Sequence, residues 1–256
     1  MLLPAINTFW HGPTLGPLDI ACLRSFSRNG HSVVLHAYEP PANTPQCVEL
    51  QDAEAVLPRG DIDHLLRARR FATVADLFRY EMLAQSLGVW VDCDCYCLKP
   101  IQDEDHIFGW EDESWINGAV LKLPADSAVL KNLRSMREGF IPPWLPIRRR
   151  LGMRLRKLCG RPKRLADMRW GTTGPQALTH FVKEAALTGL ARPVPHYYPV
   201  HWSETARFLD PSLSMEDLVS PDTVIVHFYN EMLKRNKDLT PAASPLGRVL
   251  SEAQCP

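Results

Sequence analysis

The sequence contains no run of ~18 or more apolar residues, so it predicts no transmembrane helix. Its first six residues lack both the positive charge and the apolar length of a secretory signal. It also carries no net charge, because 29 Lys and Arg balance 29 Asp and Glu. Global charge therefore favours neither nucleic acid nor a membrane as a partner. We expect a cytoplasmic protein that binds no nucleic acid and is at most peripheral on the inner face of a membrane.

The seven cysteines form no CxxC pair. Structural zinc sites usually draw their ligands from two closely spaced pairs, so no zinc centre is predicted. Cys93, Cys95 and Cys97 alternate with other residues and are expected to be core-facing thiols on one face of a strand. Reduced thiols fit a cytosolic location.

The 256 residues suffice for one large α/β domain or two small ones. Apolar runs predict strands at residues 6–10, 32–38, 107–110, 116–123 and 223–229, and helical spacing predicts helices at 18–28, 74–87, 125–138 and 173–187. The opening strand, helix and strand indicate parallel strands with a crossover helix. Thr73 is the expected cap of the helix at 74–87, residues 43–60 are expected to be loop-rich, and 241–256 a loose tail.

The most informative stretch is residues 89–97, VWVDCDCYC, an apolar run that contains two carboxylates. One strand over these residues would point Asp92 and Asp94 to the same face, because side chains alternate along a strand. Two like charges buried side by side are costly unless a positive group lies between them. A hard divalent cation that also binds phosphate oxygens is the simplest such group. The stretch therefore predicts a diphosphate site at a strand end.

The preceding helix carries Asp76 and Arg79, which are three residues apart and hence on one face. Taken alone, they are an ordinary surface ion pair that contributes little to stability. The helix ends where the aspartate strand begins, however, so both side chains are expected to lie beside the strand's exit.

Residues 75–83, ADLFRYEML, and 88–100, GVWVDCDCYCLKP, resemble the signature SDLLRYEIL…GGIYLDTDVECLKP of DXD-containing sugar transferases. Groups that share it include initiating mannosyltransferases, α-1,4-galactosyltransferases, capsular polysaccharide transferases and large glucosylating toxins. Residues 6–12, 117–121, 173–175 and 227–230 resemble, in order, the family's IHQIWFGG, NNAVI, TGP and HHWNGSW segments. The resemblance implies a GT-A-like α/β fold with a mainly parallel twisted sheet flanked by helices, in one domain over residues 1–240.

The resemblance also implies a metal site and a donor site. Asp94 would bind Mn²⁺ or Mg²⁺ directly, and Asp92 would contact both the ion and the ribose of a nucleotide-sugar. His227 or Asn230 would complete the metal and diphosphate site from the C-terminal end. The chain departs from the family here, because the usual last tryptophan is missing, so the third metal ligand stays open.

The sugar and the base have their own implied contacts. Asp76 and Arg79 would hold the sugar hydroxyls and a phosphate, for which the planar fork of Arg is suited. Asn117 would contact donor or acceptor. Trp10 would stack on the base, or it is an ordinary core aromatic. The acidic stretch 111–113 either faces the anomeric carbon or is a surface loop. Most families with this motif retain the anomeric configuration, but they share no single nucleophile, so none is named.

Residues 141–169 are expected to form a basic amphipathic insertion. Apolar residues at 145, 147, 151, 155 and 158 follow helical spacing behind Trp144, and the only acid between 148 and 169 is Asp167. The ten cations are Arg148, Arg149, Arg150, Arg154, Arg156, Lys157, Arg161, Lys163, Arg164 and Arg169. Residues 144–169 thus predict contact with an anionic membrane surface; alternatively, the leucines pack on the domain.

Taken together, these patterns predict a metal-dependent, retaining glycosyltransferase. It would move a hexose from a nucleotide-sugar, with a UDP-sugar favoured over a GDP-sugar, to a hydroxyl of a glycan or lipid-linked glycan. The alternatives are an effector-type transferase that glycosylates a protein and a nucleotide-sugar-binding module without turnover.

Overall fold

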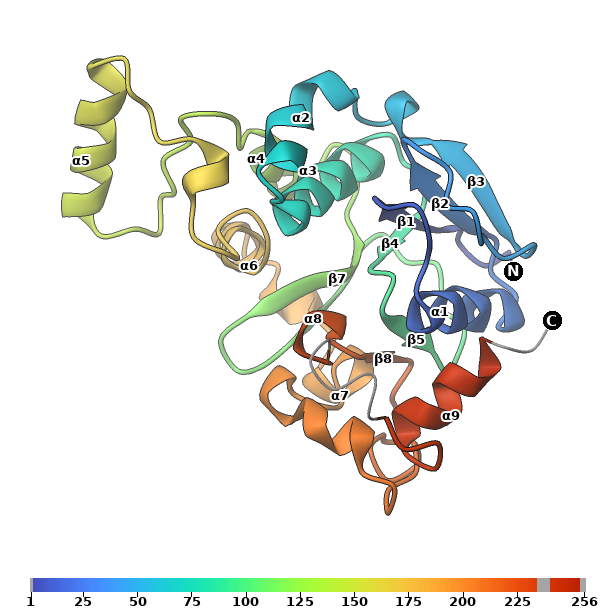
Figure 1. The fold of residues 1–256 in the computed structure, drawn as a ribbon. Coiled ribbons are helices and arrows are strands. Elements are labelled where there is room, and N and C mark those ends of the chain that lie inside the picture. The colour runs from blue at the N-terminus through green and yellow to red at the C-terminus, as the bar shows by residue number, and fades with distance from the viewer. Residues whose placement is uncertain (1, 234–239, 254–256) are drawn as a thin grey trace.

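The computed structural model describes residues 2–233 and 240–253 of the chain (Figure 1). The strands are β1 Ile6–Trp10, β2 Val33–Ala37, β3 Val48–Asp52, β4 Val89–Val91, β5 Cys95–Cys97, β6 Ile107–Trp110, β7 Ile116–Lys122 and β8 Ile225–His227. The α-helices are α1 Pro17–Arg28, α2 Arg59–Arg67, α3 Phe71–Ala84, α4 Ala128–Arg134, α5 Ile147–Leu158, α6 Pro175–Glu184, α7 Val194–Tyr197, α8 Asn230–Leu233 and α9 Pro245–Glu252. Short 3₁₀ turns lie at Ala53–Ala55, Leu165–Asp167, Thr188–Leu190 and Trp202–Leu209.

The main sheet is mixed but mostly parallel, with strand order β3-β2-β1-β4-β7-β6. The first four of these strands are parallel, and β7 and β6 join antiparallel. The buried runs of β1 and β2 are joined by α1 as a crossover helix, as the sequence predicted. The expected α/β class with a mainly parallel sheet is confirmed.

Helices cover both faces of this sheet (Figure 1). A hydrophobic core on one face joins α2, α3, α4 and α6 to the apolar side chains of β4, β6 and β7. A second core on the other face packs α1 against β1, β2 and β4. A third joins α1 to α9 and β8. In the described parts of the chain, no helix is both long and apolar enough to cross a membrane.

Three local predictions were wrong, and residues 43–60, which were expected to be loop-rich, also contain β3 and the start of α2. Thr73 lies inside α3, which begins at Phe71 after Arg70. The run 89–97 is not one strand: β4 ends at Val91 and β5 begins at Cys95. The tail is not loose over its described part, because it contains α9.

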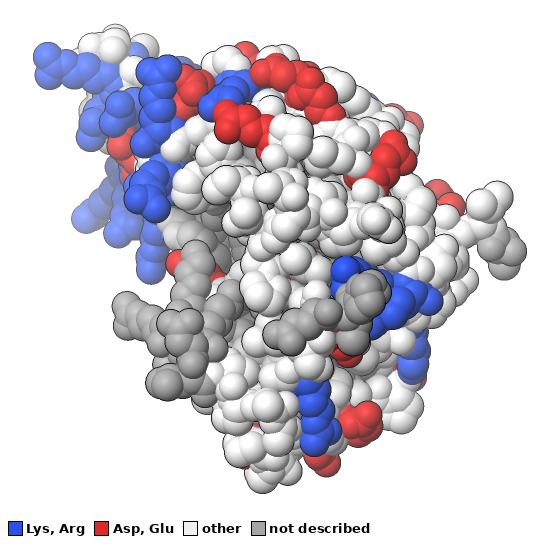
Figure 2. Space-filling model, turned by 45° about the vertical axis from the view of Figure 1, so that its right-hand side comes forward, with Lys and Arg blue, Asp and Glu red and all other residues white. Residues whose placement is uncertain are grey.

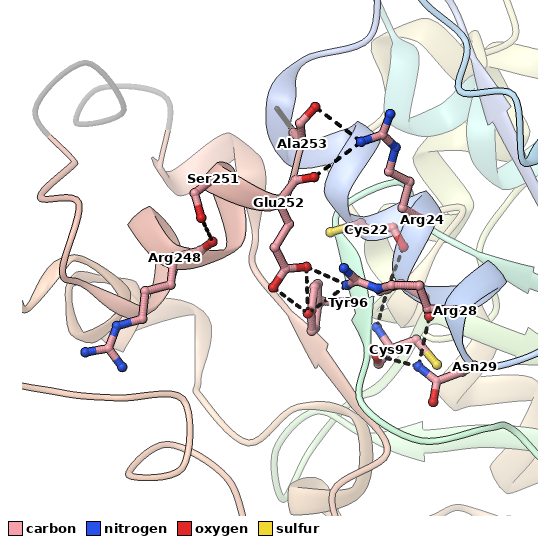
Figure 3. A network of polar contacts seen from close by, with 11 residues as sticks. Cys22, Arg24, Arg28, Asn29, Tyr96, Cys97, Arg248, Ser251, Glu252 and Ala253 are labelled. Carbon is pink, nitrogen blue, oxygen red and sulfur yellow. Dashed lines mark hydrogen bonds and ion pairs between the residues drawn. The ribbon is translucent and has the colours of Figure 1, made fainter. Parts of the chain in front are cut away.

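The α9 helix is fixed by contacts that lie far upstream in sequence. Ser244 caps its start, and Leu246 and Val249 are buried in the third core. Figure 3 shows Glu252 accepting hydrogen bonds from Arg28, at 2.5 Å, and from the Tyr96 hydroxyl, at 3.0 Å. The helix therefore supports α1 and β5, directly behind the turn that carries the two aspartates.

Candidate functional site

The two aspartates lie in a turn where the chain passes from one sheet to another. The Asp92 N–H donates to the Ala119 carbonyl, 2.8 Å away on β7, and the Asp92 carbonyl accepts from Cys95 N–H at 3.0 Å. Beyond this turn β5 pairs antiparallel with β8 in a separate two-stranded sheet, where Cys95 lies opposite His227. Asp92 and Asp94 therefore have different neighbours. The prediction that they share one face of a single strand is wrong.

Asp92 is held by the side chains that precede it. Arg79 donates to Asp92 Oδ1 at 3.1 Å, and the indole N–H of Trp90 donates to the same oxygen at 2.7 Å. The Arg79 guanidinium also lies 5.0 Å above the Trp90 ring, a cation–π distance. Among the described residues, no side chain or backbone group donates to Asp92 Oδ2. One carboxylate oxygen of Asp92 is thus fixed by two donors, and the side chain is 29% exposed.

Asp76 and Arg79 are buried, so the interpretation as a surface ion pair is wrong. Asp76 is 7% exposed and Arg79 is 6% exposed. Arg79 lies 3.6 Å from Asp76 Oδ1, and the Thr173 hydroxyl donates to Asp76 Oδ2 at 2.7 Å. Burial raises the pKa of Asp76 to about 6, although Arg79 and Thr173 act in the opposite direction. Asp76, Arg79 and Asp92 form one charged group, in which Asp76 and Arg79 are buried and Asp92 is half-buried.

Two glycines leave the space for this group. A Cβ at Gly118 would overlap the Arg79 guanidinium, and a Cβ at Gly174 would lie 3.0 Å from both carboxylate oxygens of Asp76. Gly118 is on β7 and Gly174 precedes α6. This packing gives a physical reason for the glycine of the Thr-Gly-Pro segment that the sequence resemblance singled out, whereas Gly118 stands where the family's NNAVI segment has asparagine.

Asp94 forms a second group with residues from the C-terminal end. His227 Nε2 lies 3.2 Å from Asp94 Oδ1, and the Asn230 N–H donates to Oδ2 at 2.7 Å. Burial alone would raise the pKa of Asp94, but His227 and these hydrogen bonds hold it below its usual value. Burial alone would lower the pKa of His227, but the Asp94 charge raises it. The structure thus brings the predicted residues Asp94, His227 and Asn230 together.

The donor set of this second group fits a divalent ion in part. Ligand atoms of Asp94, Cys95 and His227 all lie within 4.8 Å of one another, and Asp92 does not belong to this cluster. Burial raises the pKa of the Cys95 thiol well above its usual value, so the thiol is protonated when no ion is bound. Asp94 and His227 supply the oxygen and nitrogen ligands of this cluster. An imidazole nitrogen beside a carboxylate suits Mn²⁺ better than Mg²⁺, which prefers oxygen ligands.

Asn117 is placed by Glu111, which belongs to the acidic stretch expected either to face the anomeric carbon or to be a surface loop. Glu111 is only 8% exposed and accepts from Asn117 Nδ2 at 2.9 Å. Asn117 Oδ1 accepts a hydrogen bond from the Ala119 N–H at 2.8 Å, so both the nitrogen and the oxygen of the side-chain amide are held. The charge of Glu111 also contributes to the raised pKa of His227. The sequence feature that could have indicated the burial of Glu111 is its position directly after the buried strand β6.

The Trp10 indole makes no hydrogen bond to either charged group among the described residues. Its ring is half-buried against the second core, and its indole N–H is buried with no acceptor among the described residues. The loop backbone packs closely on it, because a Cβ at Gly12 would lie 3.2 Å from the indole nitrogen. Stacking of Trp10 on a nucleotide base stays a prediction.

Comparisons with known proteins add little at the level of sequence. No family model matches the chain, and no curated protein matches it. Among solved structures, the chain is similar to a glycosyltransferase, PaToxG, with a TM-score of 0.46 and 10% sequence identity. The match covers 71% of this chain and 70% of that one. Nothing about the function of this chain follows from a likeness at this level.

Proposed function

We propose that the protein is a metal-dependent glycosyltransferase with a GT-A-like fold that uses a nucleotide-sugar donor. The observation that carries this proposal is the pair of charged groups built around Asp92 and Asp94, at the two ends of the turn. One group offers a carboxylate, a guanidinium and a free carboxylate oxygen, and the other offers a carboxylate beside an imidazole. Sugar hydroxyls and a diphosphate with its counter-ion need these two sets of partners side by side.

The second group, around Asp94, would bind the metal ion and the diphosphate. A Mn²⁺ ion at Asp94 and His227 would neutralise the diphosphate and so stabilise the nucleotide leaving group. Because a metal ligand must be unprotonated, His227 would give up the proton that Asp94 favours when the ion binds. Asn230, whose N–H fixes Asp94, would keep that carboxylate oriented.

The donor sugar would lie against the first group. Asp76 accepts hydrogen bonds from hydroxyls when it is ionised, and Arg79 donates to a phosphate or hydroxyl while it holds Asp92. Asn117, fixed by Glu111, would present its amide to donor or acceptor. We favour a UDP-sugar over a GDP-sugar, a retaining outcome, and a hydroxyl of a glycan or lipid-linked glycan as acceptor.

The test is a panel of nucleotide-sugars with Mn²⁺, scored by release of nucleoside diphosphate. We expect slow hydrolysis of one donor, and its loss when Asp94 is replaced by Asn. Asp105→Asn, a change at an exposed acid, is the control and should leave the rate unchanged. If Asp94→Asn retained both Mn²⁺-dependent donor binding and release, the proposed metal site would be wrong.

The same geometry fits two other functions. A binding module without turnover would bind a nucleotide-sugar with Mn²⁺ but release no diphosphate from any donor in the panel. An effector-type enzyme would hydrolyse one donor, yet transfer its sugar only to a protein acceptor. The panel separates the first alternative from an enzyme, and product analysis with glycan and protein acceptors separates the second.

A further inference from the structure

The α5 helix presents its apolar side chains to solvent. No residue of α5 is buried, and Ile147, Leu151, Leu155 and Leu158 are 58%, 48%, 63% and 83% exposed. In Figure 1 the helix lies at the end of an arm that stands away from the two sheets. The alternative that the leucines pack on the domain is therefore wrong.

These four side chains form one stripe along the helix. At about 100° per residue, positions 147, 151, 155 and 158 fall within an arc of about 80°. Arg148 and Arg154 fall just outside the two edges of that arc. Long basic side chains at the edges of an apolar stripe can reach polar headgroups while the stripe enters the acyl region.

The opposite side of the helix anchors the arm to the domain. Met153 packs partly against the core around α6, and the Lys157 ammonium donates to the Gly139 carbonyl at 3.3 Å. At the root of the arm, the Trp144 indole donates to Gln176 at 3.2 Å and its ring lies 5.2 Å from that of His180. Trp144 therefore belongs to this anchor and not to the exposed stripe, and the contacts keep the stripe facing outward.

Positive charge surrounds the stripe. Figure 2 shows Lys and Arg side chains gathered where α5 and its flanking segments lie. Ten cations fall between residues 148 and 169, and the one acid there, Asp167, is paired with Arg164 at 2.9 Å. A nucleic acid would neutralise the cations but would leave four large apolar side chains in water, whereas an anionic bilayer takes up both.

We propose that α5 docks this protein on an anionic lipid bilayer, with Ile147, Leu151, Leu155 and Leu158 inserted between the headgroups. The docking stands apart from the proposed enzymatic function and needs neither donor nor metal.

The test is co-sedimentation of the full chain with vesicles of phosphatidylcholine alone or with 30% phosphatidylglycerol, at about 0.1 M salt. We expect binding only to the anionic vesicles. Leu151→Ser with Leu155→Ser should weaken it about 10-fold, because apolar area no longer enters the bilayer. Arg148→Gln, Arg149→Gln and Arg150→Gln together should weaken it about 100-fold. A control pair, Arg207→Gln with Arg248→Gln, removes exposed cations elsewhere and should change little.

All the substituted side chains are exposed or half-buried, so thermal unfolding should confirm that each variant is folded. The proposal is wrong if the wild type stays in the supernatant with anionic vesicles. It is also wrong if the serine pair binds as well as the wild type, or if the chain binds duplex RNA and not vesicles. Donor hydrolysis in solution should be unchanged in the serine pair, so failure of docking and failure of the enzymatic proposal are distinguishable.

Discussion

The replacement Arg79→Met should destabilise the protein strongly, because Arg79 is the cation between two carboxylates. Removing one partner of a buried ion pair costs about 3–5 kcal/mol. The Asp92 side chain is 29% exposed and is readily rehydrated, whereas that of Asp76 is only 10% exposed and is rehydrated far less. We therefore expect a loss near the lower end of this range, about 3 kcal/mol, and attribute most of it to Asp76.

The size of this loss should depend on pH. Burial raises the folded pKa of Asp76 to about 6, above its usual value of 3.8, so the folded state binds a proton more tightly than the unfolded state. The contribution of this proton binding to the stability of the folded state is therefore largest below pH 3.8. It declines as the pH rises and is lost above about pH 6. The difference of two pKa units corresponds to about 3 kcal/mol. Without Arg79 this pKa should rise further, so Arg79→Met should be much less destabilised at pH 5 than at pH 8.

Urea unfolding followed by far-ultraviolet circular dichroism measures these free energies without relying on Trp90. Asp76→Asn in the Arg79→Met background removes the buried charge and should recover at least half of the loss. The control is Arg67→Met, which breaks the exposed ion pair with Asp63 and should cost less than about 1 kcal/mol. A loss below about 1 kcal/mol for Arg79→Met, or one equal at pH 5 and 8, would refute the assigned role of Arg79.

Three further predictions concern the same site. Gly118→Ala should lower the free energy of unfolding by about 1–3 kcal/mol and abolish donor binding, because the added Cβ displaces the Arg79 guanidinium. Isothermal titration with the donor and Mn²⁺ measures the binding. The control is Gly152→Ala, which has open space around its Cβ. Donor binding should strengthen as the pH rises through about 6, since ionised Asp76 accepts hydrogen bonds, and this dependence should vanish in Asp76→Asn. Glu111→Gln should lower kcat more than donor affinity, because Asn117 loses its charged partner, whereas exposed Glu113→Gln should have no effect.

The sequence predicted the sheet well where buried runs are local, as in β1 and β2, in which seven of the ten side chains are apolar. It failed at residues 89–97, because the strand there is divided by a partner that the local pattern does not contain. Cys95–Cys97 pairs with β8, some 130 residues later in the chain, and this pairing pulls the backbone out of the main sheet. The α9 helix was missed for a similar reason, since Arg28 and Tyr96 bind its last turn.

The site shows the same limit. Asp76, Arg79 and Asp92 lie within 17 residues of sequence, and their grouping was predicted from helix and strand geometry. The burial of Glu111 was not predicted, because its two acidic neighbours gave the whole stretch the composition of a surface loop. Asn117 on β7 covers that carboxylate, and only the antiparallel register of β6 and β7 reveals it.

The turn from Asp92 to Asp94 also joins two mechanical units of the chain. Asp92 belongs to the main sheet through β4, whereas Asp94 is tied to β8 and α8 at the C-terminal end. A donor and ion that contact both carboxylates would fasten the small β5–β8 sheet to the large one. Donor binding and the alignment of the two sheets would then be thermodynamically coupled. The position of β8 relative to the main sheet would therefore change with donor binding.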